Sequence, residues 1–442
     1  MTRRPAGPLL GGSVGPAGPV LHPRLAEARG VVVRVVGASL RIGEKVRLVR
    51  PDSHDTQIGE VVGFTQDGAL VMPFEGLTGL SDITQVEGCG LDWHRCAAAA
   101  LLGRVVDGLG RPLDGGPEPQ AASERRAAAA MPLINPLERP VISTPFATGV
   151  RAIDGLLSCG VGQRMGIFAP AGGGKSTLLG MIANGASADA VVVGLIGERG
   201  REVAEFIEDH LGGRRNRSIV IASTADRPAA ERIKAAELAC ALAGELREEG
   251  RQVLLLFDSV TRYARALREV GLAVGEPPVR RGYPPRVFAE LPKLTEAAGL
   301  TRRGSVTAFF TILAEDEDMT DPIAEEVRSL LDGHIHLSSK LGGAGHYPAI
   351  DVLASKSRVM PRVTSARHRD QANRLRGWMS RYQEVELLLQ IGEYRRGSDP
   401  ESDVAIDRHP AIERFLRQPQ DQYCEMDSTL AALDAICRGA VP

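Results

Sequence analysis

The residues with the clearest chemistry occupy positions 169–177, which read A-P-A-G-G-G-K-S-T. This stretch matches the phosphate-binding loop G-x-x-x-x-G-K-[ST] at every fixed position except the first, where Ala169 replaces glycine. An apolar run precedes it and a helical apolar pattern follows it, so the layout is strand, glycine loop, helix. Small residues let backbone N–H groups curl around phosphate oxygens, and the helix N-terminus adds partial positive charge. The stretch therefore predicts a phosphate site rather than an ordinary glycine-rich turn.

Each residue of this loop has an expected task. Lys175 is expected to neutralise the β- and γ-phosphates of a nucleotide, and the Ser176 hydroxyl to hold Mg²⁺. Ala169 weakens the match little, because the three glycines that follow still supply a permissive backbone. The residues expected to contact the nucleotide are Pro170, Ala171, Gly172, Gly173, Gly174, Lys175, Ser176 and Thr177.

Two acidic residues follow apolar runs that are expected to lie beside the loop. Asp258 ends the run 253–257, where a nucleotide-binding sheet places the carboxylate that holds Mg²⁺ through water. Acidic residues often end strands, so the assignment of Asp258 to Mg²⁺ depends on the phosphate loop that accompanies it. Glu198 follows the run 190–196 and could polarise the water that attacks the γ-phosphate, with Arg199 stabilising nearby charge. The alternative for this pair is a solvated charge cluster that opens a helix.

Two further residues have open assignments from the sequence. Arg358 lies at the end of the expected sheet domain, and an arginine delivered to a γ-phosphate accelerates hydrolysis. A structural salt bridge is the favoured interpretation of Arg358 at this point. Tyr347 could stack on adenine, and a core tyrosine is an equally good interpretation.

Residues 143–361 contain the elements that must position these side chains, with strands and helices in alternation. Residues 229–248 have the period and the Ala, Leu, Glu and Arg content of a helix. Uninterrupted apolar strands between helices predict a buried parallel sheet with helices on both faces, an α/β fold. The runs expected to form its strands are 165–168, 190–196, 218–222, 253–257, 306–313 and 333–337.

Three segments flank this core. Residues 1–28 are rich in Gly and Pro and are expected to form a flexible tail. Short β-type runs separated by turns between residues 30 and 83 indicate a small β-barrel. Apolar residues at helical spacing from residue 366 onward indicate a helical C-terminal domain. The predicted boundaries are 1–28 for the tail, 29–97 for the barrel, 98–361 for the nucleotide-binding domain and 362–442 for the helical domain.

The composition argues against several classes of protein. The chain has 442 residues, a formal net charge of -2 and only 4% aromatic residues, so a nucleic-acid-binding surface is not expected. No apolar run has the length of a membrane span, and the first residues lack the apolar core of a secretory signal. Cys89, His94 and Cys96 lie close together in the sequence, but without a second pair of ligands, free thiols in a reducing cytoplasm are favoured over a metal site.

Six longer stretches carry a more specific signal: A-T-G-V-R-A-I-D-G-L-L, F-A-P-A-G-G-G-K-S-T-L-L-G, L-I-G-E-R-G-R-E-V, A-V-G-E-P-P-V-R-R-G-Y-P-P-R-V-F-A-E-L-P, D-P-I-A-E-E-V-R-S-L-L-D-G-H-I and G-H-Y-P-A-I-D-V-L-A-S-K-S-R-V-M. They resemble the ATPases of bacterial type III secretion, which serve injectisomes and flagella and are similar to the subunits of rotary F- and V-type ATPases. The resemblance runs from about residue 30 to the C-terminus. It implies an N-terminal β-barrel, a RecA-like P-loop NTPase core, a C-terminal helical domain and assembly as a homohexamer.

The resemblance also implies roles, cofactors and partners. It makes Glu198 the catalytic base, Arg358 an arginine finger and Tyr347 an adenine contact, with ATP and Mg²⁺ as cofactors. The implied function is ATP hydrolysis coupled to chaperone release, unfolding and export of secreted proteins. The implied partners are the stator and central-stalk proteins of the apparatus and export chaperone–substrate complexes, with a cytoplasmic location, peripheral at the inner-membrane export apparatus. Flagellar members usually begin with a partner-binding helix, which the Gly/Pro-rich start here does not resemble, so the injectisome branch is favoured over the flagellar one.

The presence of both Glu198 and Arg358 in one chain supports a ring. In rotary ATPases the two residues come from different subunit types, so a chain with both can complete a site against a copy of itself. Two alternatives remain. A ring translocase acting on RNA would need a basic, aromatic strand-binding module, and a non-catalytic nucleotide-binding subunit would lack the glutamate.

Overall fold

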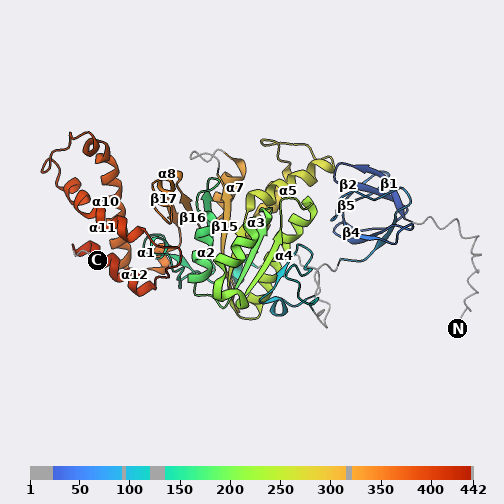
Figure 1. Cartoon of the computed structure of the whole chain (residues 1–442), viewed down its shortest axis with the longest axis horizontal. Helices are drawn as coiled ribbons and strands as arrows, with labels where there is room; N and C mark the ends of the chain where they lie inside the picture. The colour runs from blue at the N-terminus through green and yellow to red at the C-terminus, as the bar shows by residue number, and fades with distance from the viewer. Residues whose placement is uncertain (1–22, 92–95, 120–134, 315–320, 440–442) are drawn as a thin grey trace, which may run out of the picture. The chain divides into compact units, whose positions relative to one another are not determined.

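The structure is a computed structural model of the chain, and it describes residues 23–91, 96–119, 135–314 and 321–439 (Figure 1). The chain divides into two compact units, residues 1–73 with 77–90, and residues 74–76 with 91–442. The predicted tail over residues 1–22 and the candidate ligand His94 lie outside the described residues.

The first unit is a closed six-stranded antiparallel barrel with strand order β1-β2-β5-β4-β3-β6. Alternation along the strands builds its core: in β3, Val46 and Leu48 are buried while Arg47 between them is exposed. The predicted β-barrel is therefore confirmed. Its strands are β1 Arg24–Arg29, β2 Val32–Val36, β3 Lys45–Val49, β4 Thr56–Thr65, β5 Gly68–Pro73 and β6 Gln85–Gly88.

The first strand corrects one expectation. β1 begins at Arg24, inside the segment predicted to be a tail, and Leu25 is buried in the barrel core. The pairing of β1 with β2 shifts register between Leu25 and Glu27, so the alternation that normally marks a strand is broken there. The sequence of β1 therefore lacks the alternation that marks the other strands of the barrel.

The second unit is built on a sheet with strand order β17-β16-β10-β15-β13-β11-β12-β7. All neighbours in that order are parallel except β17, which runs antiparallel to β16 at one edge. The central strands are buried along their length, as their uninterrupted apolar runs predicted. The strands are β7 Val105–Val106, β10 Arg164–Ala169, β11 Ala190–Ile196, β12 Ser218–Ser223, β13 Gln252–Asp258, β15 Ser305–Leu313, β16 Gly333–Leu337 and β17 Ile350–Ser357, and β14 Gly299–Leu300 pairs with β15.

Helices pack against this sheet. Helix α4, Ala229–Glu248, contacts β11, β12 and β13, and helix α5, Val260–Ala273, contacts β15. The smaller elements of the unit are η1 Ala98–Leu101, η2 Pro136–Glu138, β8 Pro145–Phe146, α1 Arg151–Leu156, β9 Cys159–Gly160, α2 Lys175–Gly185, α3 Gly200–Glu205, η3 Phe206–His210, η4 Gly212–Arg217, α6 Pro285–Glu296, α7 Pro322–Leu330, α8 Ser339–Gly343 and α9 Met360–Val363.

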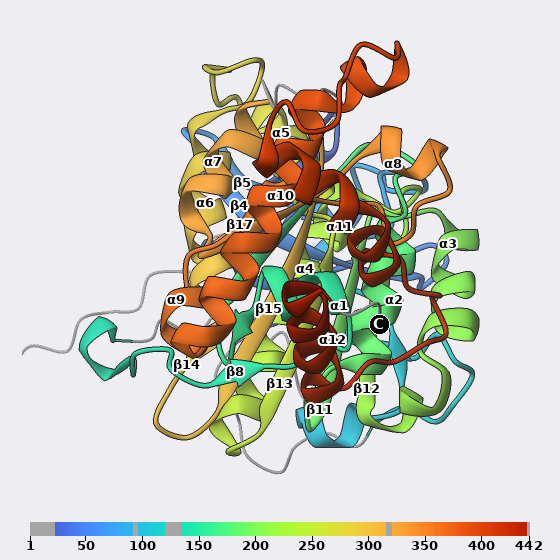
Figure 2. The same cartoon turned by 90° about the vertical axis from the view of Figure 1, so that its left-hand side faces the viewer.

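Three helices complete the chain: α10 Ala366–Gln390, α11 Pro400–Leu416 and α12 Met426–Arg438, which face the viewer in Figure 2. They pack against one another and against α1, and their apolar residues join the core of the sheet domain. Side-chain caps set two of the starts, since Ser365 accepts from the His368 N–H of α10 and Asp399 accepts from the Glu401 N–H of α11. Within the described residues, no helix combines the length and apolar character needed to cross a membrane.

Candidate active site

The phosphate loop joins the carboxyl end of β10 to the start of α2. Gly172 and Gly174 have φ angles of 76° and 80°, a left-handed conformation that favours glycine, and Gly174 is the residue from which α2 begins. Ala169, where the motif usually has glycine, is instead the last residue of β10 and pairs with Leu313. Because that position is ordinary buried strand, alanine is accommodated there without strain.

Lys175 lies between two carboxylates from neighbouring strands. Its Nζ donates to Asp258 Oδ1 at 2.5 Å and lies 3.3 Å from Glu198 Oε1. Burial works to lower the pKa of Lys175, but the attraction of Asp258 and Glu198 outweighs it and the pKa is raised. The structure thus brings the three predicted residues into one cluster at the carboxyl edge of the sheet.

Asp258 is fixed by a residue that the sequence patterns did not reveal. Thr311, on β15 beside the end of β13, donates its hydroxyl to Asp258 Oδ1 at 2.7 Å. Both side chains are buried, so the bond is sheltered from water. The signal that could have found Thr311 is its register, because Phe310 pairs with Phe257 in parallel strands and the next residues, Thr311 and Asp258, therefore lie side by side.

Glu198 is a buried carboxyl at the end of β11, with 5% of its surface exposed. Burial first, and then the negative charge of Asp258, raise the pKa of Glu198 to about 7, although Lys175 acts in the opposite direction. A carboxyl whose pKa lies near neutrality is suited to exchanging a proton with water. The alternative of a solvated charge cluster is wrong for Glu198.

Arg199 points away from this cluster. Its side chain is 75% exposed, and its Nη1 lies 3.5 Å from Glu202 Oε1. Arg199 occupies the N-cap position of α3, but its side chain makes no capping hydrogen bond. The structure therefore does not bring Arg199 together with Glu198, and its catalytic role stays a prediction.

Tyr347 lies beside the phosphate loop. A Cβ atom placed on Gly174 would be 3.8 Å from Tyr347 Cε1, and the tyrosine is 49% exposed. It is therefore not a core residue. The carbonyl of Tyr347 accepts from the N–H of Gln418, whose side chain also donates to the Gly149 carbonyl at 2.8 Å. Gln418 has no motif around it, and only the fold shows that it supports the Tyr347 loop.

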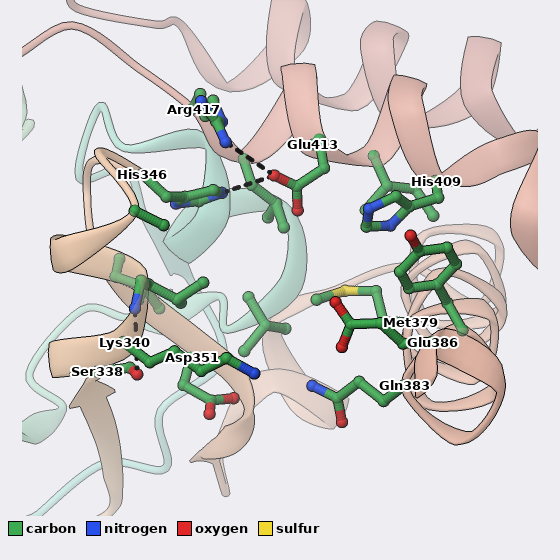
Figure 3. A pocket seen from close by; sticks show the side chains of 17 residues that line it. Ser338, Lys340, His346, Asp351, Met379, Gln383, Glu386, His409, Glu413 and Arg417 are labelled. Atoms are coloured by element: carbon green, nitrogen blue, oxygen red, sulfur yellow. Dashed lines mark hydrogen bonds and ion pairs between the residues drawn. The ribbon is translucent and has the colours of Figure 1, made fainter. Parts of the chain in front are cut away.

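Behind the Tyr347 loop lies a pocket of about 290 Å³ between β17 and α8 on one side and α10 and α11 on the other (Figure 3). His346 is buried at its edge, and its Nε2 lies 3.7 Å from Glu413 Oε2 of α11. Arg417 Nη2 approaches the same oxygen at 3.4 Å. The loop that carries Tyr347 therefore meets the C-terminal part of the chain at two points, through the hydrogen bond from Gln418 and through the approach of His346 to Glu413 of α11.

Arg358 lies far from this cluster, at the opposite edge of the sheet. Ser357 pairs with Gly333 of β16, which pairs with Met165 near the start of β10, whereas the phosphate loop follows the other end of β10. At about 3.3 Å per residue, the length of β10 separates the two by roughly 15–20 Å. The Arg358 side chain is exposed and forms no ion pair with any described residue, so the structural salt bridge is absent from the described part of the chain.

The residues fit a nucleotide with a bound cation. A glycine loop at a helix N-terminus suits phosphate, and the Ser176 hydroxyl and Asp258 carboxylate are the hard oxygen ligands that Mg²⁺ prefers. A parallel sheet of this topology with this loop, in a chain that also contains a six-stranded barrel and a set of C-terminal helices, defines a P-loop nucleoside triphosphatase.

Comparison with known proteins narrows this class. Models of the ATP synthase alpha/beta family match residues 26–90 as the beta-barrel domain and 149–357 as the nucleotide-binding domain, and the T3SS EscN ATPase C-terminal domain matches 364–435. A type 3 secretion system ATPase of Xanthomonas euvesicatoria is 50% identical over 414 residues, 93% of each chain. The flagellum-specific ATP synthase of Pseudomonas aeruginosa is 45% identical, over 96% of this chain and 95% of its own.

A solved structure agrees. The assembled ATPase EscN of enteropathogenic E. coli, in complex with its central stalk EscO, matches with a TM-score of 0.86 and 44% identity, over 94% of this chain and 99% of its own. The chain belongs to the type III secretion ATPase family. It is an ATP-hydrolysing enzyme, and the predicted RecA-like core, N-terminal barrel and C-terminal helices are confirmed.

Proposed function

We propose that this ATPase serves an injectisome and couples ATP hydrolysis to the release of chaperones from secreted proteins, their unfolding and their export. The observation that carries the hydrolytic part of the proposal is the buried cluster of Lys175, Glu198 and Asp258 beside the phosphate loop. Such a cluster supports turnover rather than mere nucleotide binding, because it holds a carboxyl of near-neutral pKa where the γ-phosphate would lie.

Each residue of the cluster has a proposed task in hydrolysis. The loop residues 170–177 bind the phosphates, and Lys175 leaves its carboxylate partners to pair with the β- and γ-phosphates. Mg²⁺, held by Ser176 and by Asp258 through water, would neutralise charge on the phosphate oxygens. Glu198, freed from Lys175, accepts a proton from the attacking water.

Arg358 is proposed to act on the neighbouring subunit. Its distance from the phosphate loop of its own chain supports this, because its side chain cannot span the sheet. Two opposite edges that carry complementary halves of a site produce a head-to-tail contact, which closes into a ring. We infer a homohexamer in which each site combines Lys175, Glu198 and Tyr347 of one subunit with Arg358 of the next.

The partners are inferred by analogy with EscN, which assembles with its central stalk EscO. We propose a corresponding stalk protein for this chain, together with stator proteins and export chaperone–substrate complexes. The protein is proposed to be cytoplasmic and to reach the inner membrane only through these partners. Tight membrane association of the purified ATPase, with no partner present, would contradict this.

A chaperone-release assay tests the function. A fluorescently labelled chaperone–substrate complex is mixed with ATP and either the wild-type protein or Glu198→Gln, which keeps the shape of the side chain but removes the base. Wild type is expected to release the chaperone, whereas Glu198→Gln should bind ATP, hydrolyse it roughly a hundredfold more slowly and release little. If Glu198→Gln released the chaperone at the wild-type rate, chaperone release would not depend on ATP hydrolysis and the proposal would be wrong.

A flagellar role is the second candidate, since a flagellum-specific relative is 45% identical over nearly the whole chain. Deletion of the gene in the source bacterium separates the two. Loss of effector secretion with intact motility supports the injectisome assignment, and loss of flagella with intact effector secretion supports the flagellar one.

A further inference from the structure

We propose that Gln163, together with the Asp332–Arg164 pair, is the mount that holds Arg358 in position for the neighbouring active site. This inference rests on the proposed role of Arg358 in trans. None of the three residues touches the nucleotide cluster of its own subunit, because all lie at the amino edge of the sheet, where β10 begins. They are positioning residues and not catalytic ones.

Gln163 is fully buried, and both ends of its amide are used. Its Oε1 accepts from the Gly160 N–H at 2.8 Å, and its Nε2 donates to Ser357 Oγ at 3.1 Å and to the Asp332 carbonyl at 3.3 Å. A buried amide is costly unless it is bonded, so these contacts fix its orientation. Gln163 thereby joins the two chain segments that flank the base of Arg358.

The second part of the mount is Asp332. Its carbonyl accepts from the Arg358 N–H at 2.9 Å, so it fixes the backbone of the proposed finger directly. Its carboxylate accepts hydrogen bonds from Arg164 Nε at 2.9 Å and Arg164 Nη2 at 3.0 Å. The backbone N–H of Arg164 donates a third hydrogen bond to the same carboxylate at 3.1 Å. This two-pronged pair sets orientation as well as distance.

The residue before the finger is held equally closely. Ser357 Oγ donates to the Ser158 carbonyl at 2.9 Å and accepts from the Met360 N–H at 3.2 Å. The neighbouring strand β16 packs closely against this segment, because a Cβ atom on Gly333 would come within 2.6 Å of the Lys356 carbonyl oxygen. The backbone on both sides of Arg358 is therefore immobilised while its side chain remains exposed.

This arrangement matters because a catalytic group must be aimed at the place where charge develops. A displacement of about 1 Å can cost on the order of a hundredfold in rate. An exposed arginine on a loose backbone would have to be ordered at each turnover, whereas a clamped backbone leaves only the side chain to be placed. The mount should thus affect the rate of hydrolysis more than the binding of ATP.

The test uses Gln163→Met, which keeps the length of the side chain but removes its hydrogen bonds. The expected result is a fall in kcat of about tenfold or more with KM for ATP changed less than about twofold. Gln252→Met is the matched control, because Gln252 is an exposed glutamine at the same edge of the sheet and its loss should change neither. Wild-type kcat in Gln163→Met would overturn the proposal.

Mixed rings show which half of the site Gln163 belongs to. Gln163→Met mixed with Lys175→Ala should regain activity, because some interfaces join an intact phosphate loop to a properly mounted arginine. Gln163→Met mixed with Arg358→Ala should regain much less, because both changes damage the same half of the site. The reverse pattern would assign Gln163 to the phosphate-loop side through β10 and would overturn the mount.

Two further measurements separate the possible failures. Ser357→Ala removes the hydroxyl that accepts the hydrogen bond from Gln163, and it is judged by the same mixtures if Gln163→Met does not fold. Lys175→Ala mixed with Arg358→Ala tests the trans role itself. If Lys175→Ala and Arg358→Ala restore activity to each other but Gln163→Met and Ser357→Ala do not follow the pattern predicted above, only the mount is overturned. If Lys175→Ala and Arg358→Ala do not restore activity, the trans role of Arg358 is overturned and the mount with it.

Discussion

Lys175 shows how one residue stabilises the site and prepares it for chemistry. Its ammonium neutralises two buried carboxylates that would otherwise repel each other, and those carboxylates have different proposed tasks. In the proposed mechanism, the nucleotide phosphates replace the carboxylates as partners of Lys175, so Glu198 would lose its cation and become a stronger base. Substrate binding would thereby be linked to activation of the proposed base.

Replacing Lys175 tests the phosphate loop. Lys175→Ala should reduce ATP hydrolysis to below about a tenth of the wild-type rate, because the β- and γ-phosphates lose their counter-charge. The protein should stay folded, because Lys175 is the first residue of α2 and its removal opens no apolar core, but the loss of its pairs with Glu198 and Asp258 should lower the melting temperature. Phosphate release and a circular-dichroism melting curve measure the two effects, and turnover above a tenth of wild type would contradict the assignment.

The pKa of Glu198 leads to a second prediction. A base must be deprotonated, so kcat/KM should rise as the pH increases through about 7 and then level off. The raised pKa also means that folding favours the protonated carboxyl. Stability from this group is complete below the unfolded pKa, near 4.5, and is lost as the pH rises through 7.

Glu198→Gln provides the check on that sign, because glutamine mimics the protonated carboxyl. The variant should melt at a higher temperature than wild type above pH 7, with the difference shrinking as the pH falls toward 5. A flat kcat/KM between pH 6 and 8 would show that Glu198 does not titrate in this range.

Among the elements, the loop between α8 and β17 links the nucleotide site to the C-terminal helices. It places Tyr347 beside the phosphate loop, and the Tyr347 carbonyl accepts a hydrogen bond from the Gln418 N–H. In the same loop, His346 lies beside Glu413 of α11 (Figure 3). A change in how the loop meets a nucleotide would therefore reach α11. This contact gives the secretion ATPase a physical route from its active site to its helical domain.

The ring of Tyr347 is predicted to bind adenine. Tyr347→Ala should raise KM for ATP about three- to tenfold with little change in kcat, as expected from the loss of an aromatic contact of about 0.5–1.5 kcal/mol. Tyr347→Phe keeps the ring and should behave as wild type. If both variants raised KM for ATP equally, or if Tyr347→Ala left KM unchanged, Tyr347 would not contact adenine through its ring.

For the whole molecule, the separation of Arg358 from its own phosphate loop predicts complementation between subunits. Arg358→Ala alone should bind ATP and be nearly inactive, because the charge of the transition state lacks its partner. In random mixtures with Lys175→Ala, interfaces with two intact halves should restore up to about a quarter of the activity if the sites act independently.

Controls decide how that mixture is interpreted. Wild type mixed with each variant measures coupling between sites, which would lower the recovery, and co-purification of differently tagged variants shows that they assemble together. No recovery from co-assembled variants, with the wild-type mixtures still active, would mean that Arg358 does not act in trans.

The sequence alone predicts those features that depend on residues close together in the chain. The phosphate loop was visible because its glycines, Lys175 and Ser176 are contiguous, and the central strands because buried parallel strands must be apolar throughout. The acids are recognisable because Asp258 ends one such apolar run and Glu198 stands two residues after another. Their types and spacing alone predicted a nucleotide site at the carboxyl edge of a parallel sheet.

Only the tertiary structure decided which distant residues meet. Thr311 holds Asp258, Gln163 holds the chain beside Arg358, and Gln418 supports Tyr347, yet each contact joins segments more than 50 residues apart. The position of Arg358 depends on β17 running antiparallel, a direction set by pairing with β16. Such contacts follow from strand order and register, which arise from packing the whole chain and leave no repeating signal in the sequence near any one residue.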